Sequence, residues 1–218
     1  MDGTLVEPCI DFADMRRRVY EIASEDWGRE VTGGDVIEME QQLSPAAREK
    51  VQVVFADIEA KALRDMTLRQ GMVELCQYLD SMSIRRAVLT RNVETSVRYM
   101  MTEKMVDVPP FVPVVARDTI NTCTNTVIAA KPQPDAIHYI CQQWNCDPSH
   151  VMMVGDSELD DMVAANRAGC GASILLQTNE DNNSGNDEQS NAVERQPSLV
   201  VESLAELEGI LKSVMVLN

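Results

Sequence analysis

Short apolar segments alternate with amphipathic ones from residue 71 onward, and this alternation leaves few architectures open to the chain. The segment 151–154 is an uninterrupted apolar run, which is typical of a parallel strand covered on both faces. Further short strands are predicted at residues 86–90, 112–116, 172–176 and 199–201. Helices are predicted at residues 71–82, from Asn92 onward, and at 134–144, 160–168 and 204–214. Strands that alternate with helices predict an α/β fold with a mostly parallel sheet and right-handed crossovers.

Residues 8–68 show helical patterns and no strand of their own. Asp11 can cap a helix to about Ser24, and Asp35 can cap a short helix to Leu43. Ser44-Pro45 is a strong helix start for a third helix to about Leu63, because serine caps and proline suits the first turn. The sequence therefore predicts a helical insert at 8–68 and a core domain made of 1–7 and 69–218.

The segment 178–196 interrupts the strand–helix pattern of the core domain. It is rich in Asn, Asp, Glu, Ser and Gly and contains almost nothing apolar. Such a composition cannot bury enough apolar surface to offset the entropy of ordering, so we expect a disordered acidic surface loop.

Charge and composition exclude several classes of partner. The formal net charge of -16 argues against nucleic-acid binding, which depends on Lys and Arg. No run of 18 or more apolar residues occurs, so no membrane span is expected. Six scattered cysteines with no CxxC pair favour the cytoplasm or another reducing compartment. Whether a targeting segment precedes Met1 is left open, as is the oligomeric state.

Four short segments carry polar groups just after predicted strands or at helix starts, where open α/β sheets bind ligands. They are Asp2–Val6, Leu89–Asn92, Lys131–Asp135 and Gly155–Asp161. Each has an ordinary structural explanation on its own, such as a turn, a strand end or an acidic first helical turn. Asp156 is the hardest to explain in this way, because a carboxylate at a strand end, before the helix, more often binds a cation.

Taken in order, the four segments resemble the motifs of the haloacid dehalogenase (HAD) superfamily: DxDGT, a strand-end Thr or Ser, a Lys, and GDxxxD. The helical insert resembles the small helical cap of the phosphoglycolate phosphatase-like branch. The resemblance implies a Rossmannoid three-layer sandwich and a magnesium-dependent phosphohydrolase.

The resemblance implies a Mg²⁺ site at the strand ends. Asp156 would be the carboxylate ligand, and the backbone carbonyl of Asp2 would also contact the metal. Asp160 would order the surroundings of the metal or bind it through water, with Asp161 as the weaker candidate for that role. Oxygen ligands of this kind suit a hard cation.

The resemblance also assigns the phosphoryl group its partners. Asp2 would be the general acid/base, and Thr90 would donate a hydrogen bond to the phosphoryl group. Backbone N–H groups of Arg91 and Asn92 lie nearby, and Lys131 would balance the negative charge. Transfer through an aspartyl-phosphate requires these groups and a carboxylate nucleophile.

One part of the family pattern falls outside the numbered chain. The motif Asp-x-Asp-Gly-Thr places the nucleophile two residues before the acid/base, and here Met1 holds the x position. We therefore expect the nucleophilic aspartate, and the first core strand that leads into it, immediately upstream of Met1. The chain as numbered is then expected to be inactive.

The leading hypothesis is a phosphatase that acts on a small phosphorylated metabolite of unidentified structure. A non-catalytic HAD-like binding or regulatory protein is the alternative from another class, and a phosphomutase on the same scaffold also stays open. Arg16, Arg17 and Arg18 in the insert can bind an anionic substrate group or form a solvated helix face.

Overall fold

A computed structural model describes residues 1–177 and 192–215, with side chains as far as Val214. The chain divides into two compact units. One consists of Met1–Glu7 together with Thr67–Asn218, and the other is Pro8–Met66. The helical unit thus ends at Met66, shortly before the end at residue 68 that the sequence predicts.

Parallel strands form the centre of the first unit. β5 (Met152–Gly155), β6 (Ala172–Leu176) and β7 (Leu199–Val201) pair in that order, all parallel. β1 (Val88–Leu89) pairs in parallel with β2 (Val114–Val115). The predicted parallel α/β architecture is confirmed.

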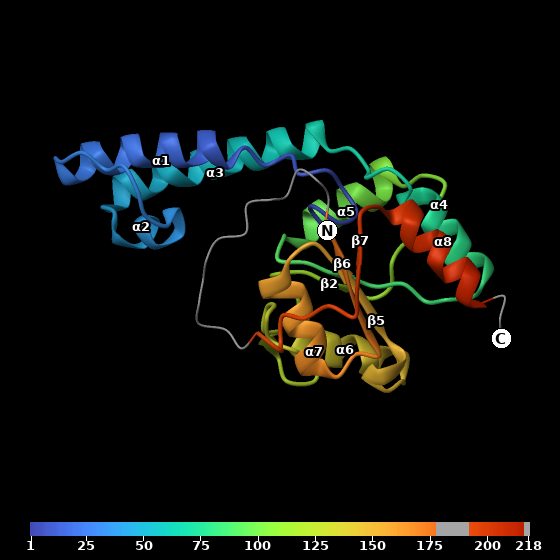
Figure 1. Ribbon diagram of the computed structural model, residues 1–218. Helices are drawn as coiled ribbons and strands as arrows, with labels where there is room; N and C mark the ends of the chain where they lie inside the picture. Colours follow the sequence, from blue (N-terminus) through green and yellow to red (C-terminus); the bar gives the residue numbers. More distant parts are fainter. Residues whose placement is uncertain (178–191, 216–218) are drawn as a thin grey trace. The chain divides into compact units, whose positions relative to one another are not determined.

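Helices cover both faces of these strands, which gives three layers. Figure 1 shows β5–β7 between two helix pairs. The pairs are α4 (Met72–Ser81) with α8 (Leu204–Met215), and α6 (Asp135–Trp144) with α7 (Val163–Ala168). Apolar residues of α6 and α7 form one buried cluster, with Leu89 and Met153 packed against it. The cluster consists of Ile137, Cys141, Ala164, Ala165 and Ala168.

Several elements of this unit are not predicted by the sequence patterns. β3 (Ile120–Asn121) and β4 (Thr126–Val127) form an antiparallel hairpin. α5 (Glu94–Tyr99) continues into a π-helical turn, Met100–Lys104, and α6 is followed by a 3-10 turn, Pro148–His150. A second π-helical turn, Glu158–Met162, precedes α7 and shapes the candidate site.

The parallel strands lie in two separate groups, because β1 pairs with no other described strand than β2. Asp2 makes an isolated parallel bridge to Val6, and Val6 makes an antiparallel bridge to Leu68. That a further strand lies upstream of Met1 stays a prediction.

The second unit is helical throughout, and the structure describes all of its residues. α1 (Phe12–Trp27) packs along α3 (Pro45–Asp65), and α2 (Val36–Gln42) lies between them in sequence (Figure 1). Asp11, Asp35 and Ser44 cap the three helices with side-chain oxygens, as the sequence predicts. The buried core contains Val19, Ala23, Leu43, Ala47, Val51, Val54 and Ile58.

The loop predicted to be disordered falls only partly on described residues. Residues 178–191 lie outside them. Residues 192–196 form a turn, and the side-chain amide of Asn166 donates to the carbonyls of Glu194 and Gln196 at 2.8 and 2.9 Å. These hydrogen bonds from α7 hold the backbone at Glu194 and Gln196, and the disorder of the whole segment 178–196 stays a prediction.

Within residues 1–177 and 192–215, no helix is both long enough and apolar enough to span a bilayer. The six cysteines all lie in this part of the chain and form no disulfide bond.

Two valines of α3 provide a matched test of the helical core. Val51 is fully buried, whereas Val53 is 66% exposed. Val51→Ala should lower the free energy of unfolding of this unit by about 2 kcal/mol, since it removes two buried methyl groups and leaves a cavity. Val53→Ala should change it by less than about 0.5 kcal/mol. Urea unfolding followed by helical circular dichroism measures both, and equal effects would contradict the described packing.

Candidate active site

The loop that begins the chain lies directly on Asp156. Thr4 donates from Oγ1 to Asp156 Oδ1 at 2.6 Å. Gly3 has φ +73°, and a Cβ at this position would come within 2.2 Å of Asp156 Oδ2. Only glycine allows both the left-handed backbone and this close approach. The predicted first and fourth motifs therefore meet.

Asp156 follows β5 and has one carboxylate oxygen, Oδ2, with no hydrogen-bond donor among residues 1–177 and 192–215. The residue as a whole is solvent-exposed, yet atoms packed around its carboxyl group raise its pKa above the ordinary value. The Asp161 charge raises this pKa further, while the Thr4 hydrogen bond and Lys131 lower it. A cation beside Oδ2 would stabilise the ionised form.

The loop after β1 supplies Thr90 and Asn92. Thr90 is buried, and its Oγ1 accepts a hydrogen bond from the backbone N–H of Asn92 at 3.1 Å. The side-chain amide of Asn92 donates to Asp2 Oδ2 at 3.3 Å. The Asn92 backbone N–H is thus already bonded, and Asn92 contacts the site through its amide, which orients Asp2.

Lys131 and Asp161 form a buried ion pair. The two side chains are 8% and 3% exposed, and Lys131 Nζ donates to Asp161 Oδ1. Asp161 Oδ2 accepts from the backbone N–H groups of Asp156 and Ser157, both at 3.1 Å. Asp161 therefore joins the lysine of the third motif to the loop that carries Asp156.

Asp160 pairs with Arg91 rather than with Lys131, and its predicted role near a metal stays a prediction. Its Oδ2 accepts from Arg91 at 2.6 Å, and its side chain is 25% exposed. The cause is the π-helical turn, in which the N–H of Met162 donates to the carbonyl of Ser157, five residues earlier. This wider turn directs Asp161 inward, where it pairs with Lys131.

The sequence contains a signal that Asp161, rather than Asp160, faces the interior. Asp161 shares a helical face with Ala164, Ala165 and Ala168, at spacings of three, four and seven residues, and all four are buried. Thr4 is a second site residue without a predicted role, although it belongs to the Asp-Gly-Thr segment.

Two arginines of the insert form surface ion pairs, Arg17 with Asp14 and Glu21, and Arg18 with Asp57. These pairs favour the solvated helix face.

The backbone nitrogen of Met1 belongs to the same cluster. Met1 is buried, and burial lowers the pKa of its amine; Lys131 lowers it further, whereas Asp161, Asp2 and Asp156 raise it. These charges come from three of the four predicted motifs, and all of them act on the Met1 amine.

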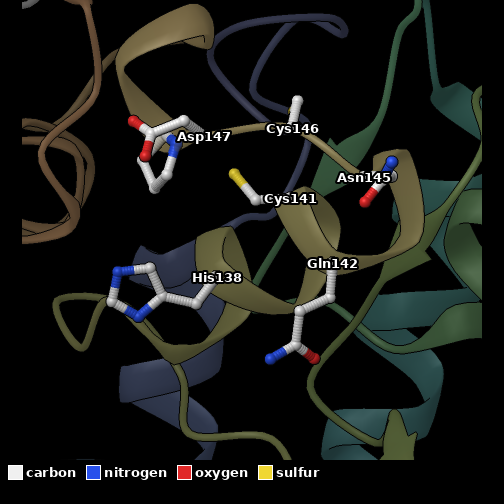
Figure 2. A pocket seen from close by; sticks show the side chains of 7 residues that line it. His138, Cys141, Gln142, Asn145, Cys146 and Asp147 are labelled. Atoms are coloured by element: carbon white, nitrogen blue, oxygen red, sulfur yellow. The ribbon is translucent and has the colours of Figure 1, made fainter.

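A separate surface hollow of about 490 Å³ lies at the C-terminal end of α6. Figure 2 shows the side chains around it, with Cys141 on the helix and Asp147 on the segment that follows. It is lined by His138, Cys141, Gln142, Asn145, Cys146, Asp147 and Pro148. None of the predicted site residues borders this hollow.

The donor set at the strand ends fits magnesium better than a softer metal. Among residues 1–177 and 192–215, no three or more His, Cys, Asp or Glu side chains are grouped to hold a metal ion. Mg²⁺ needs no such cage, since one or two carboxylates and several waters suffice. The open Oδ2 of Asp156 supplies an oxygen donor of this kind, and Asp2 lies two residues before Thr4, which is bonded to the other Asp156 oxygen.

A family model described as haloacid dehalogenase-like hydrolase matches residues 1–169. The chain belongs to this family. A haloacid dehalogenase-like hydrolase domain-containing protein of Arabidopsis thaliana is 33% identical over 223 residues, covering 100% of this chain and 84% of the relative. A hydrolase of Saccharomyces cerevisiae is 33% identical over 118 residues, covering 54% of this chain and 50% of its own length.

Solved structures of HAD enzymes share the fold. A predicted phosphoglycolate phosphatase from Haemophilus somnus superimposes with a TM-score of 0.67 at 19% identity, covering 97% of this chain and 95% of that chain. A HAD phosphatase from Thermococcus onnurineus gives 0.64 at 16% identity, covering 97% and 94%. The HAD-like fold predicted from the motifs is confirmed.

Gly3→Ala tests the close approach of the first loop to Asp156. The added Cβ requires an unfavourable φ and displaces the carboxylate, so the free energy of unfolding should fall by about 1–3 kcal/mol. Gly33→Ala is the control, because a Cβ there meets nothing within 4 Å. Thermal unfolding of both variants measures the difference, and an unchanged melting temperature in Gly3→Ala would contradict the contact.

Lys131→Met should destabilise the first unit by about 3–5 kcal/mol, because it leaves the buried Asp161 charge without its partner. The double variant Lys131→Met/Asp161→Asn should recover part of this loss. Lys61→Met is the control, since the Lys61–Asp65 pair is exposed, at 62% and 54%. Denaturant unfolding gives the coupling energy, and additive single effects would argue against the pair.

Proposed function

We propose that the protein is a magnesium-dependent phosphohydrolase that acts on small phosphate esters. The observation that carries this proposal is that hydrogen bonds join Asp156, at the end of β5, both to Thr4 of the Asp2–Val6 segment and to the Lys131–Asp161 pair. Such a cluster offers oxygen donors to a cation and positive charge to a phosphoryl group.

Asp156 and the backbone carbonyl of Asp2 are the proposed donors to Mg²⁺, with Asp161 in place of Asp160 as the carboxylate that orders their surroundings. When bound, the cation neutralises charge on the phosphoryl oxygens. Asp161 keeps the Asp156 loop in shape through the N–H groups of Asp156 and Ser157.

Asp2 is the proposed general acid/base. The amide of Asn92 fixes one carboxylate oxygen of Asp2. Asp2 would protonate the leaving oxygen and later take a proton from the attacking water.

The proposed nucleophile is an aspartate joined to Met1, through which an aspartyl-phosphate would form. Met1 is buried, and its carbonyl accepts from the N–H of Thr4, whose side chain is bonded to Asp156. That position supports a nucleophile there. The inactivity of the chain as numbered remains a prediction of the same mechanism.

Thr90 and Arg91 are the proposed hydrogen-bond donors to the phosphoryl group. Thr90 accepts from Asn92 through Oγ1, which leaves its hydroxyl proton for a phosphoryl oxygen. The backbone N–H of Arg91 makes no hydrogen bond in the part of the chain that the structure describes. We further propose that the helical unit selects the substrate, as a cap.

The test is hydrolysis of p-nitrophenyl phosphate by the protein extended upstream of Met1 by its natural sequence. Activity should require Mg²⁺ and disappear with a chelator, and Asp2→Asn should lower turnover by about 10²–10⁴-fold. Asp161→Asn should reduce activity far more than Asp160→Asn at the neighbouring position. The form that begins at Met1 should show no turnover. Full activity without a divalent metal, or in Asp156→Asn, would refute the proposal.

A further inference from the structure

An exposed ion pair lies beside the candidate site and has no role in the proposed chemistry. Arg91 directly follows Thr90, and its guanidinium donates to Asp160 Oδ2 at 2.6 Å. The Arg91 side chain is 64% exposed and that of Asp160 is 25% exposed. The pair links the loop after β1 to the π-helical turn after β5, and both segments carry site residues.

The π-helical turn accounts for the position of Asp160. With Asp161 directed toward Lys131, the preceding carboxylate is left at the surface beside Arg91. Ser157 holds it there by accepting the N–H of Asp160 at 3.1 Å. Exposed pairs of this kind contribute little to stability, so the Arg91–Asp160 contact can be exchanged for another anion at small cost.

Charge around the site makes such an exchange useful. Lys131, the proposed partner of the transferred phosphoryl group, is buried and paired with Asp161, so it is not available to a second anionic group. The net charge of -16 repels any ligand with several negative charges unless a local cation compensates. Arg91 is a cation beside Thr90 whose present partner is a surface carboxylate, and a guanidinium binds carboxylate and phosphate groups equally well in two-pronged geometry.

We propose that Arg91 is a specificity residue that binds a second anionic group of the substrate, with Asp160 as the carboxylate that this group replaces. The preferred substrates are then small phosphate monoesters that carry a further carboxylate or phosphate group. This inference rests on the proposed phosphohydrolase function and assigns its substrate class.

Equilibrium binding compares ligands that carry a second anionic group with a phosphate ester that carries a neutral hydroxyl group in its place. Titration calorimetry of the full chain with Mg²⁺ would compare glycerol 3-phosphate with 3-phosphoglycerate, which replaces a CH₂OH by a carboxylate. Glycerol 1,3-bisphosphate adds a second phosphate instead. The wild-type protein should bind at least one of the two ligands with a second anionic group more tightly than glycerol 3-phosphate. The ligand that binds more tightly shows whether Arg91 prefers a carboxylate or a phosphate.

Three variants test the assignment to Arg91. Arg91→Met should lower the preference for the anionic ligand, expressed as a ratio of dissociation constants, by about tenfold or more. Arg91→Lys should retain part of it. Asp160→Asn should raise the preference, because Arg91 then has no competing carboxylate. Because the substitutions at positions 91 and 160 shift the preference in opposite directions, a general loss of folding cannot explain both results.

An unchanged ratio in Arg91→Met, within twofold, would overturn the proposal. So would a wild-type protein that shows no preference or binds none of the three ligands. Turnover of the same esters by the upstream-extended protein is measured in parallel. A preference that depends on Arg91 without any turnover would contradict the phosphohydrolase function and leave the anion specificity of Arg91 standing.

Discussion

The buried ion pair between Lys131 and Asp161 is the interaction on which the site depends. Neither charge is tolerable alone in this environment, so each fixes the other. Asp161 also accepts two backbone N–H groups, which sets the path of the chain through Asp156. Gly155 permits this arrangement, because a Cβ there would lie 2.3 Å from Asp161 Cγ. One carboxylate thus positions the lysine and the proposed cation ligand together.

The other contacts add the remaining groups to this frame. Thr4 and Gly3 bring the first loop onto Asp156, and Asn92 connects the loop after β1 to Asp2. Each contact joins segments that are far apart in sequence, and Asn92 and Asp156 follow the parallel strands β1 and β5, at whose carboxyl ends doubly wound folds bind ligands. Membership of the haloacid dehalogenase-like hydrolase family and the contacts of the site both support the proposed phosphoryl chemistry.

Much of this structure could be predicted from the sequence, because its signals are local. Ser44-Pro45 marks the start of α3, and the apolar run before Gly155 marks β5. The β3–β4 hairpin was not predictable, since Ile120 and Val127 are exposed and each strand is too short for an alternating pattern. The pairing of Asp160 with Arg91 and of Asp161 with Lys131 was not predictable, because a π-helical turn changes the direction of a side chain without changing residue types. The contacts of residues 192–196 with Asn166 are non-local, so the composition of this segment alone cannot predict them.

Anomalous scattering from a crystal of the protein soaked in Mn²⁺, a substitute for Mg²⁺, tests the central claim most directly. The account predicts a metal peak at roughly 2.0–2.2 Å from a carboxylate oxygen of Asp156, close to Asp2, with Asp161 still paired to Lys131. A peak bound instead to Asp160, or no peak beside Asp156 at saturating metal, would contradict it.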